Sequence, residues 1–137
     1  MNIQKCGLLS LSTFSNNEGA LTFIEANTDA PFSIKRIYYL HNLSRNVKRG
    51  VHAHKQLEQL IIAVSGSFDI TIDDGNNIKQ YHMNNPQEGL YVCPMIWREI
   101  INFSSDAVLM VLASTKYDPD DYIHDYDEFI SLKKNLT

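Results

Sequence analysis

Short hydrophobic or alternating runs, each bounded by turn-forming residues, recur along most of the chain. Runs of this length that follow one another closely are typical of β-strands in an all-β sandwich or barrel. Asp74-Gly75, which lies between two such runs, predicts a tight hairpin. The predicted strands are Ala20–Glu25, Ile34–Leu40, Gly50–His54, Gln59–Ser65, Phe68–Ile72, Ile78–Met83, Leu90–Val92, Arg98–Phe103 and Ala107–Ala113.

Only the C-terminal end of the chain has the pattern of a helix. Asp118 suits the N-cap and Pro119 suits the first helical position. The hydrophobic residues that follow at helical spacing predict a stripe that packs on the barrel. They are Tyr122, Tyr126, Phe129 and Ile130. The predicted fold class is therefore all-β, a jelly-roll barrel with a short C-terminal helix.

Composition adds limits to this picture. A chain of 137 residues with 44% hydrophobic and 20% charged residues suits one globular domain, residues 1–137. No stretch resembles a signal peptide, and none approaches the roughly 18 apolar residues of a membrane span, so we expect a cytoplasmic protein that does not enter a membrane. Cys6 and Cys93 are too few and too far apart to predict a disulfide framework, so we expect two reduced thiols.

The net charge of −4 conceals an uneven distribution. Half of the 12 Lys and Arg residues lie between positions 35 and 55, which contain no Asp or Glu, whereas six of the 16 acids lie between Asp118 and Glu128. A basic zone of this kind would attract a phosphorylated ligand. Nucleic acid is the less favoured partner in an acidic protein of this size, and a solvated basic face without a ligand remains an alternative.

The most informative residues of the basic zone are His52 and His54. On a strand their side chains point to the same face, roughly 6–7 Å apart along the chain direction. Histidine can exchange protons near neutral pH and is also the commonest metal ligand. The pair therefore predicts either a proton-transfer site or a metal site.

The surrounding residues resemble the two motifs of the cupin family. His52, His54 and Glu58 correspond to the metal ligands of its first motif, and the stretch from residue 89 to residue 102 resembles its second motif. Arg98 stands where that motif has a histidine ligand, and a guanidinium cannot ligate a cation. We therefore expect no metal and give Glu58 a hydrogen-bonding or edge position, although a site with three ligands stays open.

A more specific pattern extends over most of the chain, from about Phe14 to Phe129. It consists of segments 31–39, 49–55, 57–59, 73–75, 89–92, Pro94, Trp97, 103–106 and 111–114. In this pattern the chain resembles the family of dTDP-sugar 3,4-ketoisomerases. The resemblance implies a cupin double-stranded β-helix, a homodimer that exchanges N-terminal strands, and catalysis without metal or cofactor. It further implies dTDP-4-keto-6-deoxyglucose as the substrate and a 3-keto product, which is passed to an aminotransferase for 3-amino-3,6-dideoxy sugars of surface glycans such as O-antigen.

By this resemblance His52 is the principal base and His54 its partner in proton transfer. Tyr39 is expected to contact the sugar or to act as an acid. General acid–base catalysis of this kind is typically worth about 10²–10⁴-fold. The remaining histidines have no such surroundings, and we expect them to be solvated or to cap helices. They are His41, His82 and His124.

The expected binding residues are mainly cationic. Arg49 and Arg36 are assigned to the pyrophosphate, with Lys48 as an auxiliary. Arg98 is expected to bind a sugar oxygen or to stabilise an enediolate. The aromatic candidates for stacking on the ligand, which could equally belong to the core, are Trp97 and Tyr91.

Two questions stay open at this level. Arg98 favours the gluco arrangement at C4 of the product, whereas Glu18, before an early glycine, matches neither pattern expected in the family. The alternative functions are a dTDP-4-keto-6-deoxyglucose epimerase, a metal-dependent cupin and a non-catalytic sugar-nucleotide-binding cupin.

Overall fold

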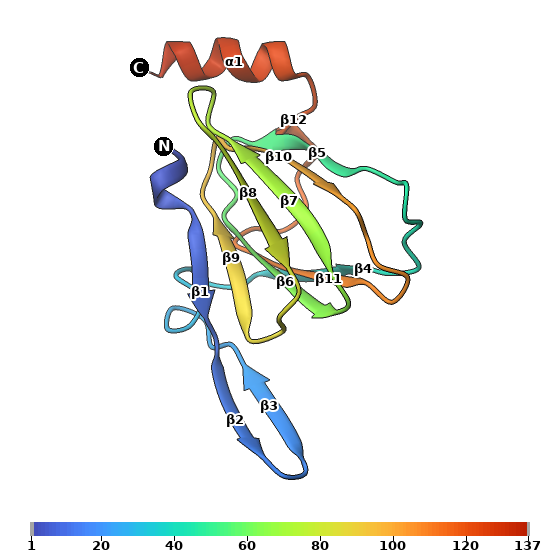
Figure 1. Ribbon diagram of the computed structural model, residues 1–137. Helices are drawn as coiled ribbons and strands as arrows, with labels where there is room; N and C mark the ends of the chain where they lie inside the picture. The colour runs from blue at the N-terminus through green and yellow to red at the C-terminus, as the bar shows by residue number, and fades with distance from the viewer. Residues whose placement is uncertain (1, 137) are drawn as a thin grey trace.

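The computed structural model describes residues 2–136, so the two end residues of the expected domain lie outside the described range. The described residues form two facing antiparallel sheets of five strands, a separate two-stranded arm and one α-helix (Figure 1). This architecture confirms the predicted all-β jelly-roll barrel with a C-terminal helix.

Strands distant in the sequence are neighbours in both sheets. The first sheet has the order β1 (Gly7–Ser10), β9 (Glu88–Val92), β6 (Gln59–Ser65), β11 (Val108–Ala113) and β4 (Arg36–Leu40). The second has the order β12 (Tyr122–Ile123), β5 (Arg49–His54), β10 (Trp97–Ile101), β7 (Phe68–Asp73) and β8 (Ile78–Met83).

Among the described residues, three hydrophobic clusters hold these layers together. The largest lies between the sheets, where alternate residues such as Phe68, Ile70 and Ile72 of β7 are fully buried. A second cluster, which includes Phe32, covers the outer side of the first sheet. The third buries Phe129 of α1 (Tyr126–Asn135) against Trp97 on the outer side of the second sheet. The predicted packing of the helix on the barrel is thereby confirmed.

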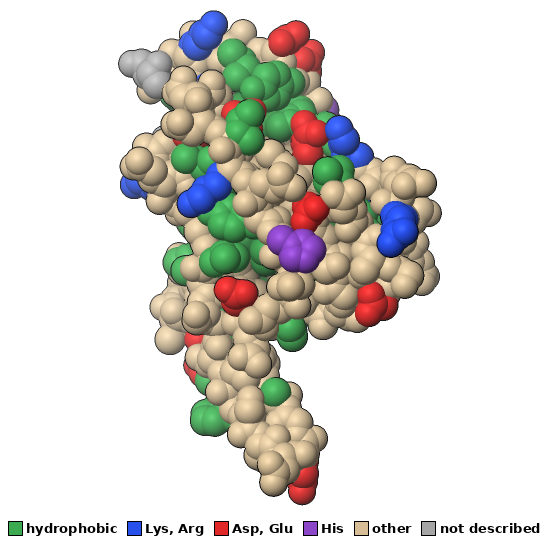
Figure 2. Space-filling view, viewed as in Figure 1, with side chains coloured by type: hydrophobic (Ala, Val, Ile, Leu, Met, Phe, Trp, Pro, Cys, Tyr) green, Lys and Arg blue, Asp and Glu red, His purple; other side chains and the backbone are tan. Residues whose placement is uncertain are grey.

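The arm consists of β2 (Ser12–Asn16) and β3 (Gly19–Phe23) and projects away from the barrel (Figure 1). Its hydrophobic side chains are uncovered: Phe14 is 71% exposed and Leu21 is 60% exposed. Hydrophobic atoms are visible on the surface of the arm in Figure 2. Large exposed apolar side chains on a projecting hairpin are typical of an interaction surface.

All nine predicted strands are present, and β6 and β8 have the predicted bounds. The hairpin at Asp74-Gly75 joins β7 to β8, and Gly75 has the positive φ of 94° that favours glycine. The sequence pattern did not reveal β1, β2 or β12. The first two are short and partly exposed, so they lack a strong hydrophobic alternation.

The C-terminal helix begins later than predicted. Asp118 caps a single 3₁₀ turn, Pro119–Asp121, and the chain then forms β12 before Asp125 caps α1. The backbone of Tyr122 pairs with His54 of β5, so a continuous helix would have to give up these sheet hydrogen bonds. Tertiary pairing therefore overrides the local helix signal.

The fold brings the two cysteines together although they lie 87 positions apart. The Sγ atoms of Cys6 and Cys93 are 3.6 Å apart, and both side chains are buried free thiols. The hydrogen bond between the two thiols lowers the pKa of Cys6 to about 7 and raises that of Cys93 above its usual value. Within residues 2–136, no helix is long and apolar enough to span a membrane.

Candidate active site

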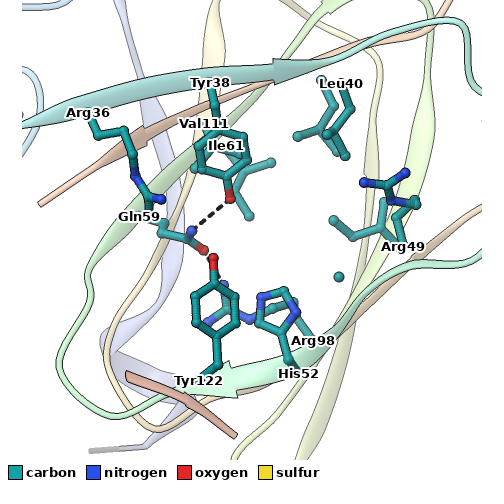
Figure 3. Close-up of a pocket in the computed structure, with 13 residues that line it drawn as sticks. Arg36, Tyr38, Leu40, Arg49, His52, Gln59, Ile61, Arg98, Val111 and Tyr122 are labelled. Atoms are coloured by element: carbon teal, nitrogen blue, oxygen red, sulfur yellow. Dashed lines mark hydrogen bonds between the residues drawn. The ribbon is translucent and has the colours of Figure 1, made fainter. Parts of the chain in front are cut away.

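A cavity of about 420 Å³ opens between the two sheets at the end formed by β4, β5 and β12 (Figure 3). Its lining comes from alternate residues of several strands, as expected where side chains alternate between the two faces of a sheet. The lining residues are Arg36, Tyr38, Leu40, Arg49, Gly50, His52, Gln59, Ile61, Arg98, Ile100, Leu109, Val111 and Tyr122.

A β-bulge in β5 lets both Arg49 and His52 line this cavity. Three positions separate them, so on a regular strand they would face opposite sides of the sheet. His52 pairs with Arg98 of β10, but Arg49 pairs with Ile100, so two residues of β5 oppose one residue of β10. Gly50 supplies the positive φ of 64° that such a bulge requires.

The cavity carries three arginines, and none of its lining residues among those described is Asp or Glu. Arg36 lies over the ring of Tyr38, with its guanidinium carbon 5.2 Å from the ring centre. The Nε atom of Arg36 is buried and has no hydrogen-bond partner within residues 2–136. These features make the cavity suitable for an anionic ligand, because an arginine fork matches phosphate or carboxylate oxygens.

Arg98 lies on the cavity floor and is only 2% exposed. It donates hydrogen bonds to Gln59 Oε1 and to the backbone carbonyl of Ile96, and it has no ion pair with any residue of the described range. Burial lowers the pKa of its guanidinium from the usual value. A buried cation without a carboxylate partner favours binding of an anion or of an oxygen that becomes negative.

Gln59 connects Arg98 to Tyr38. Because Arg98 occupies the amide oxygen of Gln59, the amide nitrogen faces Tyr38 and donates to its hydroxyl at 3.0 Å (Figure 3). The hydroxyl is thus an acceptor within the protein, and its own proton is left to donate into the cavity. Burial raises the pKa of Tyr38, which keeps this proton in place at neutral pH.

The two histidines of β5 occupy different depths. His52 lines the cavity, whereas His54 lies on the same side of the strand but is fully buried beyond the lining. Their ring centres are 4.7 Å apart. Burial, and next the positive charge of Arg98, lower the pKa of His52 to about 3 and that of His54 to about 2. Both rings are therefore neutral at pH 7, and His52 can act as a base.

The C-terminal segment completes the site. Tyr122 lines the cavity, with its ring centre 5.0 Å from His52 and 4.4 Å from His54. His124 stacks on Tyr122 and lies 6.0 Å from His52. Asp121 accepts a hydrogen bond from His54 at 3.1 Å between Oδ2 and Nδ1. The sequence carried no signal for these contacts, because the segment had the pattern of a helix.

Two adjacent tyrosines on β4 have opposite orientations. Tyr38 faces the cavity, whereas Tyr39 is 59% exposed on the other side of the strand and lies against His41, with ring centres 5.6 Å apart. Tyr39 is therefore outside the cavity of its own chain. The pairing of Tyr38 with Val111 on β11 determines which tyrosine points inward.

Three other expected binding residues also lie outside the cavity. Trp97 packs on α1 and donates from Nε1 to Glu99 at 3.1 Å. Tyr91 donates to Glu58 at 2.6 Å, and burial raises its pKa above the usual range. Lys48 forms an exposed ion pair with Glu99 at 3.0 Å. The structure thus brings together His52, Arg36, Arg49 and Arg98, with His54 directly behind.

The residues at the cupin ligand positions do not converge on one point. Glu58 hydrogen-bonds to Tyr91, whereas the next residue, Gln59, lines the cavity. Within residues 2–136, no group of three or more His, Cys, Asp or Glu side chains could hold a metal ion. Glu58 has the hydrogen-bonding position expected from the sequence.

Comparisons with known proteins agree on one family. The family model FdtA, described as WxcM-like, C-terminal, matches residues 4–134. The TDP-4-oxo-6-deoxy-alpha-D-glucose-3,4-oxoisomerase of Aneurinibacillus thermoaerophilus is 45% identical over 122 residues, which cover 89% of this chain and 88% of the relative.

Two solved structures have the same fold over almost the whole chain. A mutant of the 3,4-ketoisomerase QdtA from Thermoanaerobacterium thermosaccharolyticum, in complex with TDP-4-keto-6-deoxyglucose, is 37% identical with a TM-score of 0.94, covering 98% of this chain and 97% of that chain. The WlaRB TDP-quinovose 3,4-ketoisomerase from Campylobacter jejuni is 46% identical with a TM-score of 0.90, covering 94% and 99%.

Proposed function

The chain belongs to the FdtA family (WxcM-like, C-terminal), and from this premise we propose that its cavity binds dTDP-4-keto-6-deoxyglucose. The protein is a sugar-nucleotide 3,4-ketoisomerase that forms a dTDP-3-keto-6-deoxyhexose. The observation that carries the proposal is the neutral His52 ring beside Arg98 in a cavity whose described lining contains no acid.

The reaction needs a base and a stabiliser for a negative oxygen. The hydrogen on C3 of the substrate is acidified by the ketone at C4, and its removal gives an enediolate. A proton is then returned to C4, so that C3 becomes the ketone and C4 carries the hydroxyl. One proton leaves C3 and one leaves O3, while one is added at C4 and one at O4, so atoms and charge balance. Neither metal nor cofactor is needed for these steps.

His52 is our candidate for the base that removes the C3 proton, and His54 is its partner. The lowered pKa of His52 leaves its ring unprotonated at pH 7, and this ring faces the cavity directly. Tyr38 takes the role that the sequence suggested for Tyr39, because its free hydroxyl proton can be donated to O4. Arg98 pairs with His52 across the sheet and lines the same cavity, and it is our candidate for stabilising the enediolate.

Arg36 and Arg49 are our candidates for binding the pyrophosphate. Both line the cavity, and the unpartnered Nε of Arg36 has a donor available for a phosphate oxygen. Lys48, paired with Glu99, can serve only as an auxiliary charge near this end of β5. Ligand stacking by Trp97 or Tyr91 is not part of the proposal, because neither residue lines the cavity. Trp97 packs with Phe129 of α1, and Tyr91 is held by its hydrogen bond to Glu58.

We further propose a homodimer in which the arms of two copies are exchanged. The exposed Phe14 and Leu21 support this arrangement, since their burial would follow from pairing with a second copy. Glu18 lies in the turn that joins the two strands of the arm, and the arm projects away from the barrel of its own chain (Figure 1). Any influence of Glu18 on the sugar would therefore act on the cavity of the partner.

We propose that the product has the gluco configuration at C4. The family resemblance connects an arginine at the position of Arg98 with the gluco product, and the chain is also similar to a ketoisomerase that is named for TDP-quinovose. The 3-ketone of the product is the group that an aminotransferase would convert to an amine, which suits a place before transamination in the synthesis of surface glycans. The free thiols of Cys6 and Cys93 favour the reducing cytoplasm as its compartment.

The decisive experiment mixes the protein with dTDP-4-keto-6-deoxyglucose in D₂O and follows the carbonyl carbon by NMR. We expect the carbonyl to move to C3, with deuterium at C4 of a gluco product. An epimerase would instead introduce deuterium at C3 and C5 and leave the ketone at C4. His52→Asn should abolish the movement while His82→Asn, at an exposed histidine, should not. If the carbonyl stays at C4 with folded protein, the proposal is refuted. If the protein only binds the sugar nucleotide, His52→Asn should leave that binding unchanged and no carbonyl movement should be seen in the parent chain.

A further inference from the structure

His54 does not line the cavity, so its contacts are not explained by a role in binding the substrate. Its ring is fully buried beyond the cavity lining, and its Nε2 atom has no hydrogen-bond partner within residues 2–136. Its Nδ1 atom lies 3.1 Å from Asp121 Oδ2. A carboxylate oxygen only accepts, so the hydrogen of the neutral ring lies on Nδ1 and Nε2 carries a lone pair. A buried acceptor without a donor is costly unless the reaction supplies the donor.

We propose that Asp121 is a positioning residue that acts on His52 through His54. Asp121 holds His54 as the Nδ1–H tautomer, so that Nε2 can accept a hydrogen bond from the His52 imidazolium that forms when the C3 proton is removed. This inference rests on the proposed function, because it concerns the base of that reaction. It adds a carboxylate outside the cavity to the catalytic apparatus.

The charges around His54 explain why a carboxylate is needed there. The charged or titratable groups around His54 are Arg98, Arg36, His52, His124, Tyr122 and Asp121. Two of these are arginines, and burial together with Arg98 already disfavours a charged ring at either histidine. A proton taken by His52 is therefore unfavourable unless a nearby acceptor, backed by a negative charge, compensates for it. Asp121 supplies that charge through the Nδ1–H hydrogen bond.

Asp121 is held rigidly enough to select one tautomer. Its Oδ1 accepts the backbone N–H of Gln56 at 2.8 Å, and its own carbonyl accepts the backbone N–H of Lys55 at 2.9 Å. Its side chain is only 12% exposed. The following residue, Tyr122, pairs directly with His54 across the sheet. The carboxylate thus has one oxygen fixed by the backbone and the other directed at the histidine.

The experiment compares Asp121→Asn, Asp121→Glu and the control Asp120→Asn, which changes a neighbouring exposed acid. Nitrogen NMR of ¹⁵N-histidine-labelled protein should show His54 as the Nδ1–H tautomer in the parent chain. In Asp121→Asn the amide can donate to Nδ1, so the hydrogen should move to Nε2. We expect kcat to fall by about 10²-fold or more with little change in KM, partial recovery in Asp121→Glu, and no change in Asp120→Asn.

Each result has a defined meaning. An Nε2–H tautomer in the parent chain overturns the proposal, even if Asp121→Asn fails to fold. A folded Asp121→Asn that keeps kcat within about threefold of the parent also overturns it. The tautomer is measured without substrate, so a protein with the expected tautomers but no isomerase activity would instead contradict the proposed function.

Discussion

Arg49 and His52 face the same cavity although three positions separate them on one strand. The bulge at Gly50 rotates this part of β5 so that a candidate phosphate-binding residue and the candidate base share one site. The position has little room for a side chain, because a Cβ atom on Gly50 would lie 3.2 Å from Ile100 Cδ1. In the proposed mechanism, binding by Arg49 and catalysis by His52 both depend on the backbone conformation of Gly50.

Gly50→Ala should lower the free energy of unfolding by about 1–2 kcal/mol, because an alanine at a φ of 64° is strained. It should also lower kcat/KM, since relaxation of the bulge would turn Arg49 or His52 away from the cavity. Denaturant unfolding and steady-state kinetics measure both effects. Gly7→Ala is the matched control, because a Cβ there would meet no atom within 4 Å. Equal stability of the two variants would contradict the role of the bulge.

Tyr38→Phe should reduce kcat by about 10²–10³-fold, because it removes a hydroxyl donor directed at the developing oxyanion. Tyr39→Phe removes the same group from the next residue and should stay within about twofold of the parent. Kinetics on dTDP-4-keto-6-deoxyglucose would test the pair side by side. A larger loss of kcat in Tyr39→Phe than in Tyr38→Phe would show that Tyr39 is the acid.

Stability should fall as the pH decreases below 6.5. Burial lowers the pKa of His52 to about 3 and of His54 to about 2, so below pH 6.5 the unfolded chain binds protons that the folded chain does not. The free energy of unfolding then rises with pH in this window. Each histidine should contribute about 1 kcal/mol of loss between pH 6.5 and 5.5.

Denaturant unfolding at these two pH values measures the loss. Replacing one of the two rings, as in His54→Gln, should remove about half of it. A loss that is unchanged in both His52→Asn and His54→Gln would show that these rings are not buried as neutral groups.

Mild oxidation by a small disulfide reagent should join Cys6 to Cys93. Their sulfurs are 3.6 Å apart, and the pKa of Cys6, lowered to about 7, gives it thiolate character at neutral pH. The product should have lost two hydrogens by mass spectrometry and should resist unfolding by about 2–4 kcal/mol more than the reduced chain. Cys93→Ser should abolish the gain. Two free thiols after oxidation followed by unfolding would contradict the prediction.

Phe14→Asp should weaken association of two copies, because a charge would replace a large apolar side chain on the exposed arm. Analytical ultracentrifugation should show a dimer for the parent and a shift toward monomer for the variant. Ile78→Asp, at a residue of β8 with similar exposure (69%), is the control and should remain dimeric. A monomeric parent chain would refute the exchanged dimer.

The strands and several site residues could be predicted because their signals are local. Alternation along β6 and β8 and the turn residues at Asp74-Gly75 depend only on neighbouring positions. The spacing of His52 and His54 on one strand, and the guanidinium at Arg98 in place of a ligand, are likewise visible in the chain itself. These features were enough to indicate proton chemistry on a phosphorylated ligand in a barrel.

The remaining features depend on contacts between distant segments. The choice between Tyr38 and Tyr39 rests on the register of β4 against β11, and a shift of one residue exchanges the faces of a strand. Asp121 and Tyr122 reach the histidines because β12 pairs with β5, at the expense of a helix that local propensity favours. The proximity of Cys6 and Cys93 has the same origin. Local sequence thus specifies which side chains alternate, whereas the pairing of strands far apart in the chain selects those that share a site, because hydrogen-bond register and burial are properties of the assembled barrel.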